Sequence, residues 1–227
     1  AFKSQKEFVE NASHELKTPI ASVKGYLETV LNNPDLDKRK QHYFVEKAYN
    51  QSERLTQLVN DIALLNKIEE SSELYAREKI GVKKLVDEVV ESFSDAIRNK
   101  NIQVEVSVNQ SITVNANYSL IFSVFRNLME NSLNYGGDGI AINISNYHED
   151  STFQYFSFSD SGPGVEEEHL NRIFERFYRV DSGRSRKQGG TGLGLAIVKN
   201  AVVSFKGEIS ARKRKGGGLE FLFSLPK

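Results

Sequence analysis

The chain contains a histidine whose neighbours could carry out group transfer. His14 is followed directly by Glu15, and Thr18 comes four residues after it. Residues four apart lie on the same face of a helix, so the histidine and the threonine would be neighbours. A neutral imidazole can attack a phosphorus atom, while Glu15 accepts the ring proton and Thr18 positions a water molecule. These residues indicate phosphoryl transfer, and an ordinary exposed histidine is the alternative.

Two further features narrow this interpretation. His14 and Glu15 open like the zinc-binding motif His-Glu-x-x-His, but Thr18 stands where the second histidine is required, which argues against a metalloprotease. Pro19 removes one helical hydrogen bond and predicts a hinge just after the reactive turn. The other histidines lie in polar stretches and are expected to be solvated; they are His42, His148 and His169.

The second half of the chain contains residues suited to a nucleotide. Asp160 follows an alternating apolar segment and precedes Gly162 and Gly164. Its carboxylate can accept a hydrogen bond from an exocyclic amine such as that of adenine, and the glycines allow the backbone to turn close to the ring. A simple turn at the end of a strand is the alternative.

A glycine-rich stretch from 190 to 195 comes just before a predicted helix. Amide groups at a helix N-terminus can bind phosphates. The stretch is not a P-loop, because no Gly-Lys-Ser/Thr follows, and Leu195 stands where a dinucleotide fingerprint requires its third glycine.

A helix and a loop offer further groups for a nucleotide. The amide oxygen of Asn131 can ligate a Mg²⁺ ion that bridges phosphates, and Tyr135 lies one turn later. The polar loop between Phe174 and Gly190 predicts a mobile lid over a polyphosphate. Its arginines are Arg176, Arg179, Arg184 and Arg186. The alternatives are a polar helix face, a packed ring and a surface loop.

Composition excludes several classes of protein. The 227 residues are 39% hydrophobic and carry 30 basic and 30 acidic side chains, so a core can form but no net charge attracts nucleic acid or an anionic membrane. The absence of cysteine excludes disulfides, zinc-thiolate sites and a cysteine nucleophile. No apolar run reaches the roughly 18 residues of a membrane-spanning helix. From the polar start we expect the sequence to be the middle of a longer protein.

Two helices of about seven turns each are predicted in the first third of the chain. Their apolar residues recur at alternating steps of four and three, which is a heptad seam. The seam residues are Val9, Ser13, Leu16, Ile20, Val23, Leu27 and Val30, then Phe44, Ala48, Gln51, Leu55, Leu58, Ile62 and Leu65. Residues 32–35 break the first helix, Asp37 is the expected N-cap of the second, and His14 is expected on the outer flank. A dimeric four-helix bundle would bury both stripes, and a hairpin docked on the second half is the alternative.

The hydrophobic period changes after residue 78. Alternation of polar and apolar residues predicts strands, and apolar residues three to four apart predict helices. The expected helices are 82–98, 120–135, 166–174 and 191–205, and the expected strands are 102–108, 111–115, 140–147, 153–160, 207–213 and 219–225. Helices mixed with antiparallel strands indicate an α/β sandwich, in which helices cover one face of a sheet.

Taken in order, five segments resemble the cytoplasmic catalytic core of bacterial two-component sensor histidine kinases. Residues 8–19 resemble the H-box, 127–131 the N-box, 160–164 the first glycine box, 174–179 the F-box and 190–195 the second glycine box. The resemblance covers essentially the whole chain. It implies a dimerisation and phosphotransfer domain of the HisKA type, followed by an ATP-binding domain of the GHKL type found in gyrase, heat-shock chaperones and MutL.

The resemblance implies an α+β fold in two domains. Residues 1–70 would form the helical hairpin of a dimeric four-helix bundle, 71–78 the linker, and 79–227 the ATP-binding α/β sandwich. The implied cofactors are ATP and Mg²⁺. The implied partners are a second copy of the chain and the receiver domain of a response regulator, without nucleic acid. The implied location is the cytoplasmic portion of a membrane-anchored sensor kinase.

The implied activity is autophosphorylation of His14 by ATP, followed by transfer to an aspartate of the regulator. Glu15 and Thr18 are typical of members that also dephosphorylate the regulator. Asn131 would ligate the metal, and Asp160 would recognise adenine. The implied nucleotide-binding residues are Asn127, Asn131, Tyr135, Asp160, Gly162, Gly164, Arg176, Arg179, Gly190, Thr191, Gly192, Leu193, Gly194 and Leu195.

Two alternatives stay open beside this activity. A conformational ATPase of the chaperone or MutL type would carry a water-activating glutamate where this chain has Asn127, and a silent scaffold would not need Asp160, Asn131 and the glycines. Two positions depart from the family pattern. Asn134 replaces a basic residue, whose phosphate contact a lid arginine could supply, and Ser161 stands where asparagine is common.

Overall fold

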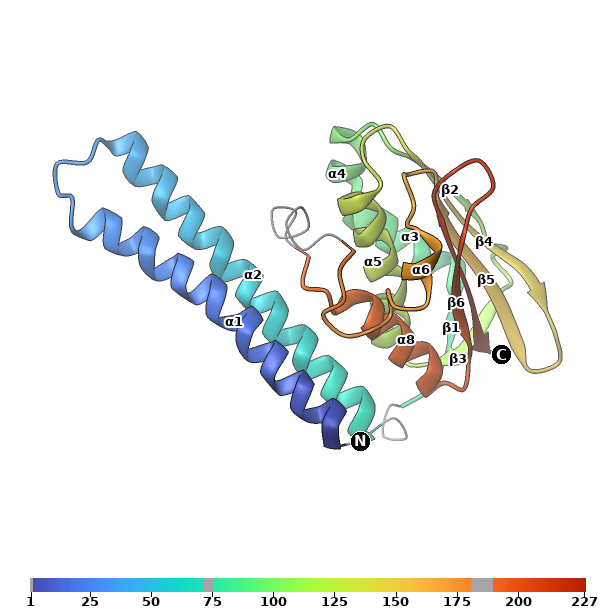
Figure 1. Cartoon of the computed structure of the whole chain (residues 1–227). Coiled ribbons are helices and arrows are strands. Elements are labelled where there is room, and N and C mark those ends of the chain that lie inside the picture. The colour runs from blue at the N-terminus through green and yellow to red at the C-terminus, as the bar shows by residue number, and fades with distance from the viewer. Residues whose placement is uncertain (1, 72–75, 181–189) are drawn as a thin grey trace. The chain divides into compact units, whose positions relative to one another are not determined.

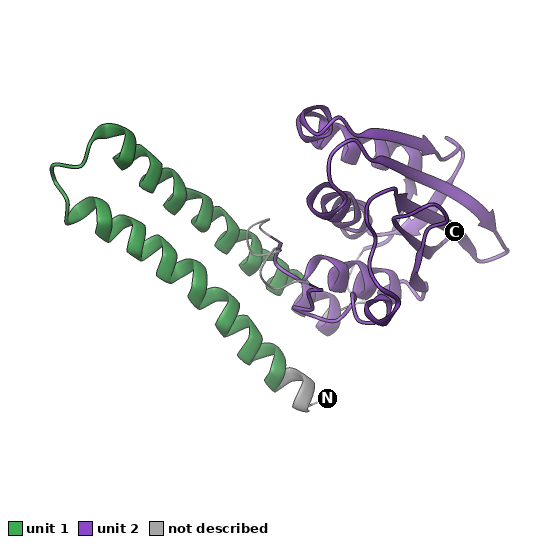
Figure 2. Cartoon of the chain, turned by 45° about the horizontal axis from the view of Figure 1, so that its top comes forward, with its two compact units in different colours: residues 1–64 green, residues 65–227 purple. Residues whose placement is uncertain are grey.

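The computed structural model describes residues 2–71, 76–180 and 190–227, with the backbone alone for residues 2–5 and 71. The chain divides into two compact units, residues 1–64 and 65–227, which Figure 2 colours green and purple.

The first unit is a helical hairpin (Figure 1). Helix α1 spans Phe2–Leu31 and helix α2 spans Lys38–Ser71, so they contain 30 and 34 residues and exceed the length expected. The predicted N-cap is confirmed, since Oδ1 of Asp37 accepts the backbone N–H groups of Arg39 and Lys40, both at 3.0 Å. Pro19 lies inside α1, which continues as a helix on both sides of it.

The two predicted apolar stripes differ in burial. All seven seam residues of α2 are buried or half-buried. On α1, the buried side chains include Phe8 and Pro19, which stand one residue before the predicted seam. Val9, Ile20 and Leu27 of that seam are 58%, 52% and 42% exposed. Within one chain the hairpin therefore leaves these three seam residues of α1 exposed. The four-helix bundle that the seam predicts needs a second copy of the chain, so it stays a prediction.

The second unit is built on a five-stranded sheet with the order β2-β4-β5-β7-β6. Its strands are β2 (Gln103–Ser107), β4 (Ala141–Glu149), β5 (Phe153–Asp160), β6 (Ile209–Lys213) and β7 (Leu219–Pro226). Strands β2 and β4 are parallel, and the other neighbours are antiparallel. The prediction of antiparallel strands is wrong for this pair, because the chain makes a long crossover between β2 and β4 that permits parallel pairing.

A second sheet contains two antiparallel strands, β1 (Glu78–Gly81) and β3 (Thr113–Ala116). The four residues of β1 do not alternate between polar and apolar side chains, so their sequence does not predict a strand. Ile80 is the one buried residue among them. Only Glu78 of β1 falls in the predicted linker 71–78, and the strand is held in place by its pairing with β3.

The helices of this unit are α3 (Val82–Ser92), α4 (Ser94–Asn99), α5 (Tyr118–Tyr135), α6 (Glu167–Leu170) and α8 (Gly194–Ser204). The single helix predicted for 82–98 is interrupted at Phe93, whose φ and ψ are −108° and 10°. The helix predicted for 166–174 is limited to the four residues of α6. Tight turns continue from there to residue 175, and turns of three to four residues can bury the same positions as a helix does.

Helices α3, α5 and α8 cover one face of the five-stranded sheet, as predicted (Figure 1). Phe125 of α5 packs edge-on against Phe156 of β5 and Phe223 of β7, with ring centroids 6.2 and 5.6 Å away. Helix α5 also packs along α8, so the two helices that carry the predicted nucleotide residues hold each other in place. None of the helices in the described ranges combines the length and hydropathy that crossing a bilayer requires.

Candidate functional site

The predicted phosphoacceptor lies on a solvent-facing turn of α1. His14 and Thr18 are exposed, and Glu15 is half-buried. The Thr18 hydroxyl donates to the backbone carbonyl of His14 at 3.4 Å, which is the weak back-bonding usual for a helix threonine. Since both side chains are exposed one turn apart, a phosphorus atom can approach them from solvent.

Three predicted nucleotide residues form one stripe along α5. Asn127, Asn131 and Tyr135 are spaced four apart, and none of them is buried. The amide nitrogen of Asn127 donates to the carbonyl and the hydroxyl of Ser123, at 2.8 and 3.1 Å. The amide of Asn131 has no hydrogen-bond partner within the part of the chain that the structure describes. Its oxygen is therefore available to a ligand or a metal ion.

Asp160 lies at the end of β5, where the strand meets α5. The residue is 4% exposed, and its carboxylate is held by two donors. Oδ1 accepts the backbone N–H of Gly162 at 2.9 Å, and Oδ2 accepts the hydroxyl hydrogen of Ser132 at 2.8 Å. An ionised carboxylate has about four acceptor positions, so capacity remains for an amine of a ligand.

The turn after Asp160 packs closely against two other backbone segments. A Cβ atom on Gly162 would lie 2.7 Å from Cα of Gly136, just after α5. Gly164 has a φ of +69°, and its Cβ atom would lie 2.8 Å from the carbonyl oxygen of Gly218 in the turn between β6 and β7. The glycines thus permit close packing within the chain, and their closeness to a purine ring stays a prediction.

The second glycine stretch lies against the α5 stripe. Helix α8 begins at Gly194 without a side-chain cap, so the N–H groups of its first turn have no acceptor within the helix. A Cβ atom on Gly194 would lie 2.7 Å from Oδ1 of Asn127, and one on Gly190 would overlap the hydroxyl of Tyr135. The free N-terminal amides, which suit phosphate, therefore lie beside the asparagines of α5.

The remaining residues of this stretch support its backbone. The hydroxyl oxygen of Thr191 accepts the backbone N–H of Leu193 at 3.2 Å. Leu193 is buried and Leu195 is half-buried. We therefore expect these two leucines to support the site by packing, while the glycines and Thr191 approach the ligand.

The F-box residues hold the second glycine stretch from the other side. The backbone N–H of Phe177 donates to the carbonyl of Gly192 at 2.8 Å, and these residues have φ values of 62° and 74°. A positive φ is uncommon for a bulky residue such as Phe177 and costs roughly 1–3 kcal/mol, so the surrounding contacts must maintain it. The guanidinium of Arg179 donates to the carbonyl of Gly190. Arg179 thus connects the chain just before residue 181 with the chain just after residue 189.

The other predicted lid arginines differ in position. Arg176 forms an ion pair with Glu69 within the second unit. Arg184 and Arg186 lie outside the described residues.

Two supporting contacts have no counterpart among the predicted residues. His169, expected to be solvated, is half-buried, and its Nδ1 atom lies 2.6 Å from the hydroxyl of Tyr178. Arg172 lies over the Tyr178 ring, 4.3 Å from its centroid, and its hydrogen bond to Glu175 raises the pKa of Arg172. Ser132 is also absent from the predicted site residues, although it contacts Asp160. A hydroxyl at an apolar position of α5 is a signal that could have identified it.

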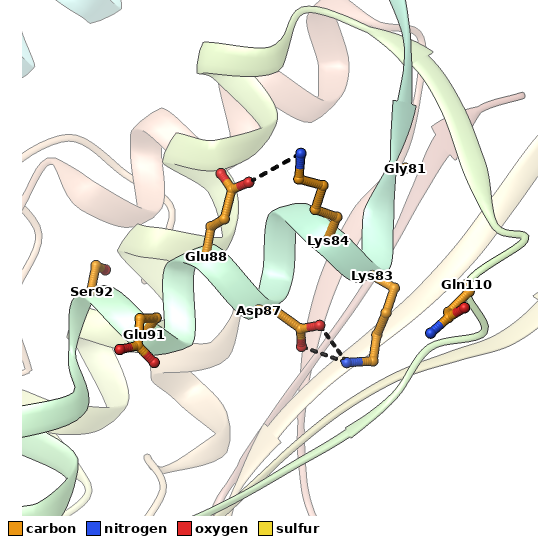
Figure 3. Close-up of a pocket in the computed structure, with 8 residues that line it drawn as sticks. All are labelled: Gly81, Lys83, Lys84, Asp87, Glu88, Glu91, Ser92 and Gln110. Atoms are coloured by element: carbon orange, nitrogen blue, oxygen red, sulfur yellow. Dashed lines mark hydrogen bonds and ion pairs between the residues drawn. The ribbon is translucent and has the colours of Figure 1, made fainter.

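A surface hollow of about 780 Å³ lies along α3 (Figure 3). Lys83 pairs there with Asp87 at 2.5 Å, and Lys84 pairs with Glu88 at 4.0 Å. Glu88 also accepts a hydrogen bond from Tyr118, which raises the pKa of Tyr118 to about 12. The predicted site residues do not line this hollow, and its ion pairs neutralise one another, so it does not suit a polyphosphate.

Two family models match the chain. The His Kinase A (phospho-acceptor) domain matches residues 4–71, and the Histidine kinase-, DNA gyrase B-, and HSP90-like ATPase matches residues 116–227. His14 lies in the first match and Asp160 in the second. The ATPase match implies that the second unit binds ATP.

Similar proteins extend over both units. Sensor histidine kinase WalK of Bacillus subtilis (strain 168) is 33% identical over 228 residues, which cover 99% of this chain and 37% of WalK. Signal transduction histidine-protein kinase BaeS of Escherichia coli (strain K12) is 33% identical over 222 residues, which cover 98% of this chain and 47% of BaeS. The chain therefore spans less than half the length of these relatives.

Solved structures share the fold. The Acinetobacter baumannii histidine kinase AdeS has a TM-score of 0.77 at 25% identity, over 94% of this chain and 97% of that chain. Histidine kinase ThkA, solved in complex with response regulator protein TrrA, has a TM-score of 0.67 at 23% identity, over 97% of this chain and 61% of that chain.

Proposed function

The chain belongs to the sensor histidine kinases of two-component systems, as their catalytic core, and we propose that it phosphorylates His14 from ATP and passes the phosphoryl group to an aspartate of a response regulator. One observation carries this proposal. In the ATPase domain, the uncapped start of α8 lies against Asn127 of α5, one turn from Asn131, whose side-chain amide has no partner in the described residues. The proposal assigns phosphotransfer to residues 1–70 and ATP binding to residues 79–227, joined by the linker 71–78.

The nucleotide residues divide by chemistry. Asp160 accepts a hydrogen bond from the adenine amine, and Gly162 and Gly164 keep the backbone close to the base. The N-terminal amides of α8 bind the phosphates, as helix N-termini do. Arg179 supports this arrangement by holding the carbonyl of Gly190.

The metal site depends on the nucleotide. In the described ranges, no group of three or more histidine, cysteine, aspartate or glutamate side chains could hold a metal ion. Asn131 offers one amide oxygen, which fits the way Mg²⁺ is bound by few protein ligands together with phosphates and water. A bound Mg²⁺ would neutralise charge on the phosphates during transfer.

The transfer step forms one bond and breaks one. A ring nitrogen of His14 attacks the γ-phosphorus, the bond from that phosphorus to the bridging oxygen breaks, and ADP leaves with the electron pair. Glu15 accepts the ring proton. The chain contributes chiefly by positioning the reactants and neutralising charge, which are the main sources of rate in phosphoryl transfer.

Thr18 supports a second activity at the same turn. Its exposed hydroxyl lies one turn after His14 and can position a water molecule for hydrolysis of the regulator's aspartyl phosphate. Thr18→Ala should then lose phosphatase activity and keep autophosphorylation, whereas Thr18→Ser should keep both. Unchanged phosphatase activity in Thr18→Ala would remove this part of the proposal.

The partners follow from the exposed surfaces of the hairpin. The apolar row of Val9, Ile20 and Leu27 supports a homodimer, in which a second copy covers it. ThkA was solved in complex with response regulator protein TrrA, and we propose that the receiver domain of a response regulator is the partner of this chain. WalK is named a sensor histidine kinase, and we propose the cytoplasmic side of a membrane sensor as the location of this chain.

A conformational ATPase of the chaperone or MutL type is the second candidate, because that fold is shared. Such an enzyme needs a glutamate as base four residues before Asn131. Asn127 stands there, and it cannot take a proton from water because a neutral amide is not a base; its amide nitrogen donates to Ser123. The missing base favours the kinase.

Labelled ATP tests the proposal. The chain is incubated with γ-labelled ATP and Mg²⁺, beside His14→Gln, Asn131→Ala and the control His42→Gln, which changes another exposed histidine. We expect acid-labile, alkali-stable label on the parent and the control, and none on the other two. Label on His14→Gln, or an unlabelled parent that still binds ATP, would contradict the proposal.

A further inference from the structure

Ser132 differs from other helix hydroxyls of this chain in the direction of its hydrogen bond. The hydroxyls of Ser22, Thr29 and Ser52 donate to the carbonyl four residues earlier in their own helices, at 3.0, 2.8 and 3.0 Å. This back-bonding is the usual choice for serine and threonine inside a helix. Ser132 instead donates to the Asp160 carboxylate on a neighbouring strand, at 2.8 Å.

The hydrogen bond of Ser132 is buried, so its loss should cost more free energy than the loss of the exposed bonds of Ser22 and Thr29. Ser132 is 1% exposed and Asp160 is 4% exposed. Removing a partner from a buried charged group leaves it unpaired, which costs more than losing a bond at the surface. The Asp160 carboxylate receives Ser132 on Oδ2 and the Gly162 amide on Oδ1, so both its position and the rotation of its plane are restrained.

The backbone of Ser132 supports the same site. Its carbonyl oxygen accepts the N–H of Gly136 at 2.8 Å. Gly136 is the residue against which Gly162 packs, with no space for a Cβ atom between them. Ser132 therefore restrains both the acceptor at the end of β5 and the backbone that faces the turn after it.

We propose that Ser132 is a positioning residue for selection of the nucleotide base, because it directs the remaining acceptor positions of Asp160 toward the 6-substituent of a purine. The inference rests on the proposed function, in which Asp160 accepts the adenine amine. A 6-amino group donates to a carboxylate held in this way. A 6-oxo group, as in hypoxanthine or guanine, presents an acceptor to an acceptor at position 6, so this hydrogen bond is lost. Without Ser132 the carboxylate can turn, and its preference for the amine weakens.

The test compares three nucleotides that differ at position 6 of the purine, of which the 6-oxo nucleotide also carries a hydrogen on N1. ATP, ITP and purine riboside triphosphate carry an amine, an oxo group and hydrogen at position 6. Equilibrium binding of each to the whole chain is measured by calorimetry for the parent, Ser132→Ala and Ser92→Ala. Ser92 is the matched control, since its hydroxyl donates within α3 to the carbonyl of Val89 at 2.6 Å.

For Ser132→Ala, we expect the Kd for ATP to rise about tenfold, as for loss of one hydrogen bond to a charged group. The Kd for purine riboside triphosphate should change less than about twofold, since that ligand offers Asp160 no donor. In autophosphorylation, the KM for ATP should rise and the rate at saturation should stay. Ser92→Ala should bind all three nucleotides as the parent does.

Equal weakening of ATP and purine riboside triphosphate in Ser132→Ala would show that Ser132 only supports packing, and would overturn the inference. Unchanged ATP binding would overturn it as well. Partial unfolding cannot imitate the expected result, because it would remove sites for all three nucleotides alike.

The variant Asp160→Asn distinguishes a failure of the role proposed for Ser132 from a failure of the proposed function. If it weakens ATP much more than purine riboside triphosphate while Ser132→Ala keeps the parent's ratio, only the role of Ser132 fails. If Asp160→Asn keeps the parent's ratio, adenine is not read by Asp160, and both the inference and that part of the proposed function fail.

Discussion

The side-chain oxygen of Asn127 lies 2.7 Å from the point that a Cβ atom on Gly194 would occupy. Helices α5 and α8 therefore meet at this position without space for a methyl group. Because Gly194 opens α8, the contact sets how closely the free amides of that helix approach the α5 stripe. The interhelical packing and the proposed phosphate site thus share one contact.

Gly194→Ala should weaken ATP binding about three- to tenfold, because the new methyl group displaces the Asn127 amide or moves the start of α8. Calorimetric titration with ATP measures this. In an Asn127→Ala background the same substitution should cost little, since the clash is gone. An equal cost in both backgrounds would argue against the clash. Gly25→Ala is the control: no atom lies within 4 Å of its Cβ position, and it should leave ATP binding unchanged.

Gly162→Ala should be more damaging than Gly194→Ala. Its Cβ atom would meet backbone atoms of Gly136, Cα at 2.7 Å and the carbonyl oxygen at 2.8 Å, which cannot swing away as a side chain can. We expect a loss of stability of about 1–3 kcal/mol, as for overpacking, together with at least tenfold weaker ATP binding. Thermal unfolding and calorimetry measure the two effects. An unchanged midpoint of unfolding would show that the turn has room to adjust.

Tyr178→Phe should raise the KM for ATP about two- to tenfold, because it removes a hydrogen bond worth about 0.5–1.5 kcal/mol between the F-box and His169. The ring under Arg172 is kept, so folding should be little affected. His169→Ala should have a similar effect on KM, and the double variant should be no worse than either single variant. Additive effects in the double variant would mean that the two residues act separately.

Leu27→Asp should dissociate the dimer, since a charge replaces an apolar side chain that is 42% exposed in one chain. Burying an unpaired carboxylate between two helices is costly. Lys24→Asp is the control, since it places the same charge at an exposed polar position of α1. Sedimentation equilibrium should give a dimer for the parent and the control and a monomer for Leu27→Asp. A monomeric parent would remove the dimer from the proposal.

Asp150→Ala should destabilise the turn between β4 and β5 at neutral pH and not in strong acid. The backbone N–H groups of Thr152 and Phe153 and the Tyr155 hydroxyl donate to Asp150, and they lower its pKa from 3.8 to about 2. A carboxyl whose pKa is lowered by folding stabilises the protein above its unfolded pKa and loses that effect as pH falls through its folded pKa. The difference in unfolding free energy between parent and variant should therefore shrink from about pH 4 to pH 2. A pH-independent difference would point to packing alone.

The sequence by itself predicts the elements whose apolar residues follow a complete period. Helices α2 and α5 and strand β5 are predicted in this way, because burial on one face imposes a period that a single segment records. The five boxes are equally local, so they locate Asn131, Asp160 and the glycine stretches without coordinates.

The sequence of one segment does not show which of its residues another segment will cover. The α1 stripe divides between Pro19, which the hairpin buries, and Ile20, which it leaves exposed. Strand β1 shows no period, because its place depends on pairing with β3.

Tertiary structure alone decides which groups meet across the chain. Ser132 and Asp160 are 28 residues apart, and their hydrogen bond exists only because α5 packs over the end of β5. Arg179 resembles a phosphate ligand in the sequence, yet in the folded chain it holds the carbonyl of Gly190. Sequence patterns encode local conformation and the side of a segment that is buried. The partner of a polar group depends on the packing of distant segments, and that packing is a property of the whole fold.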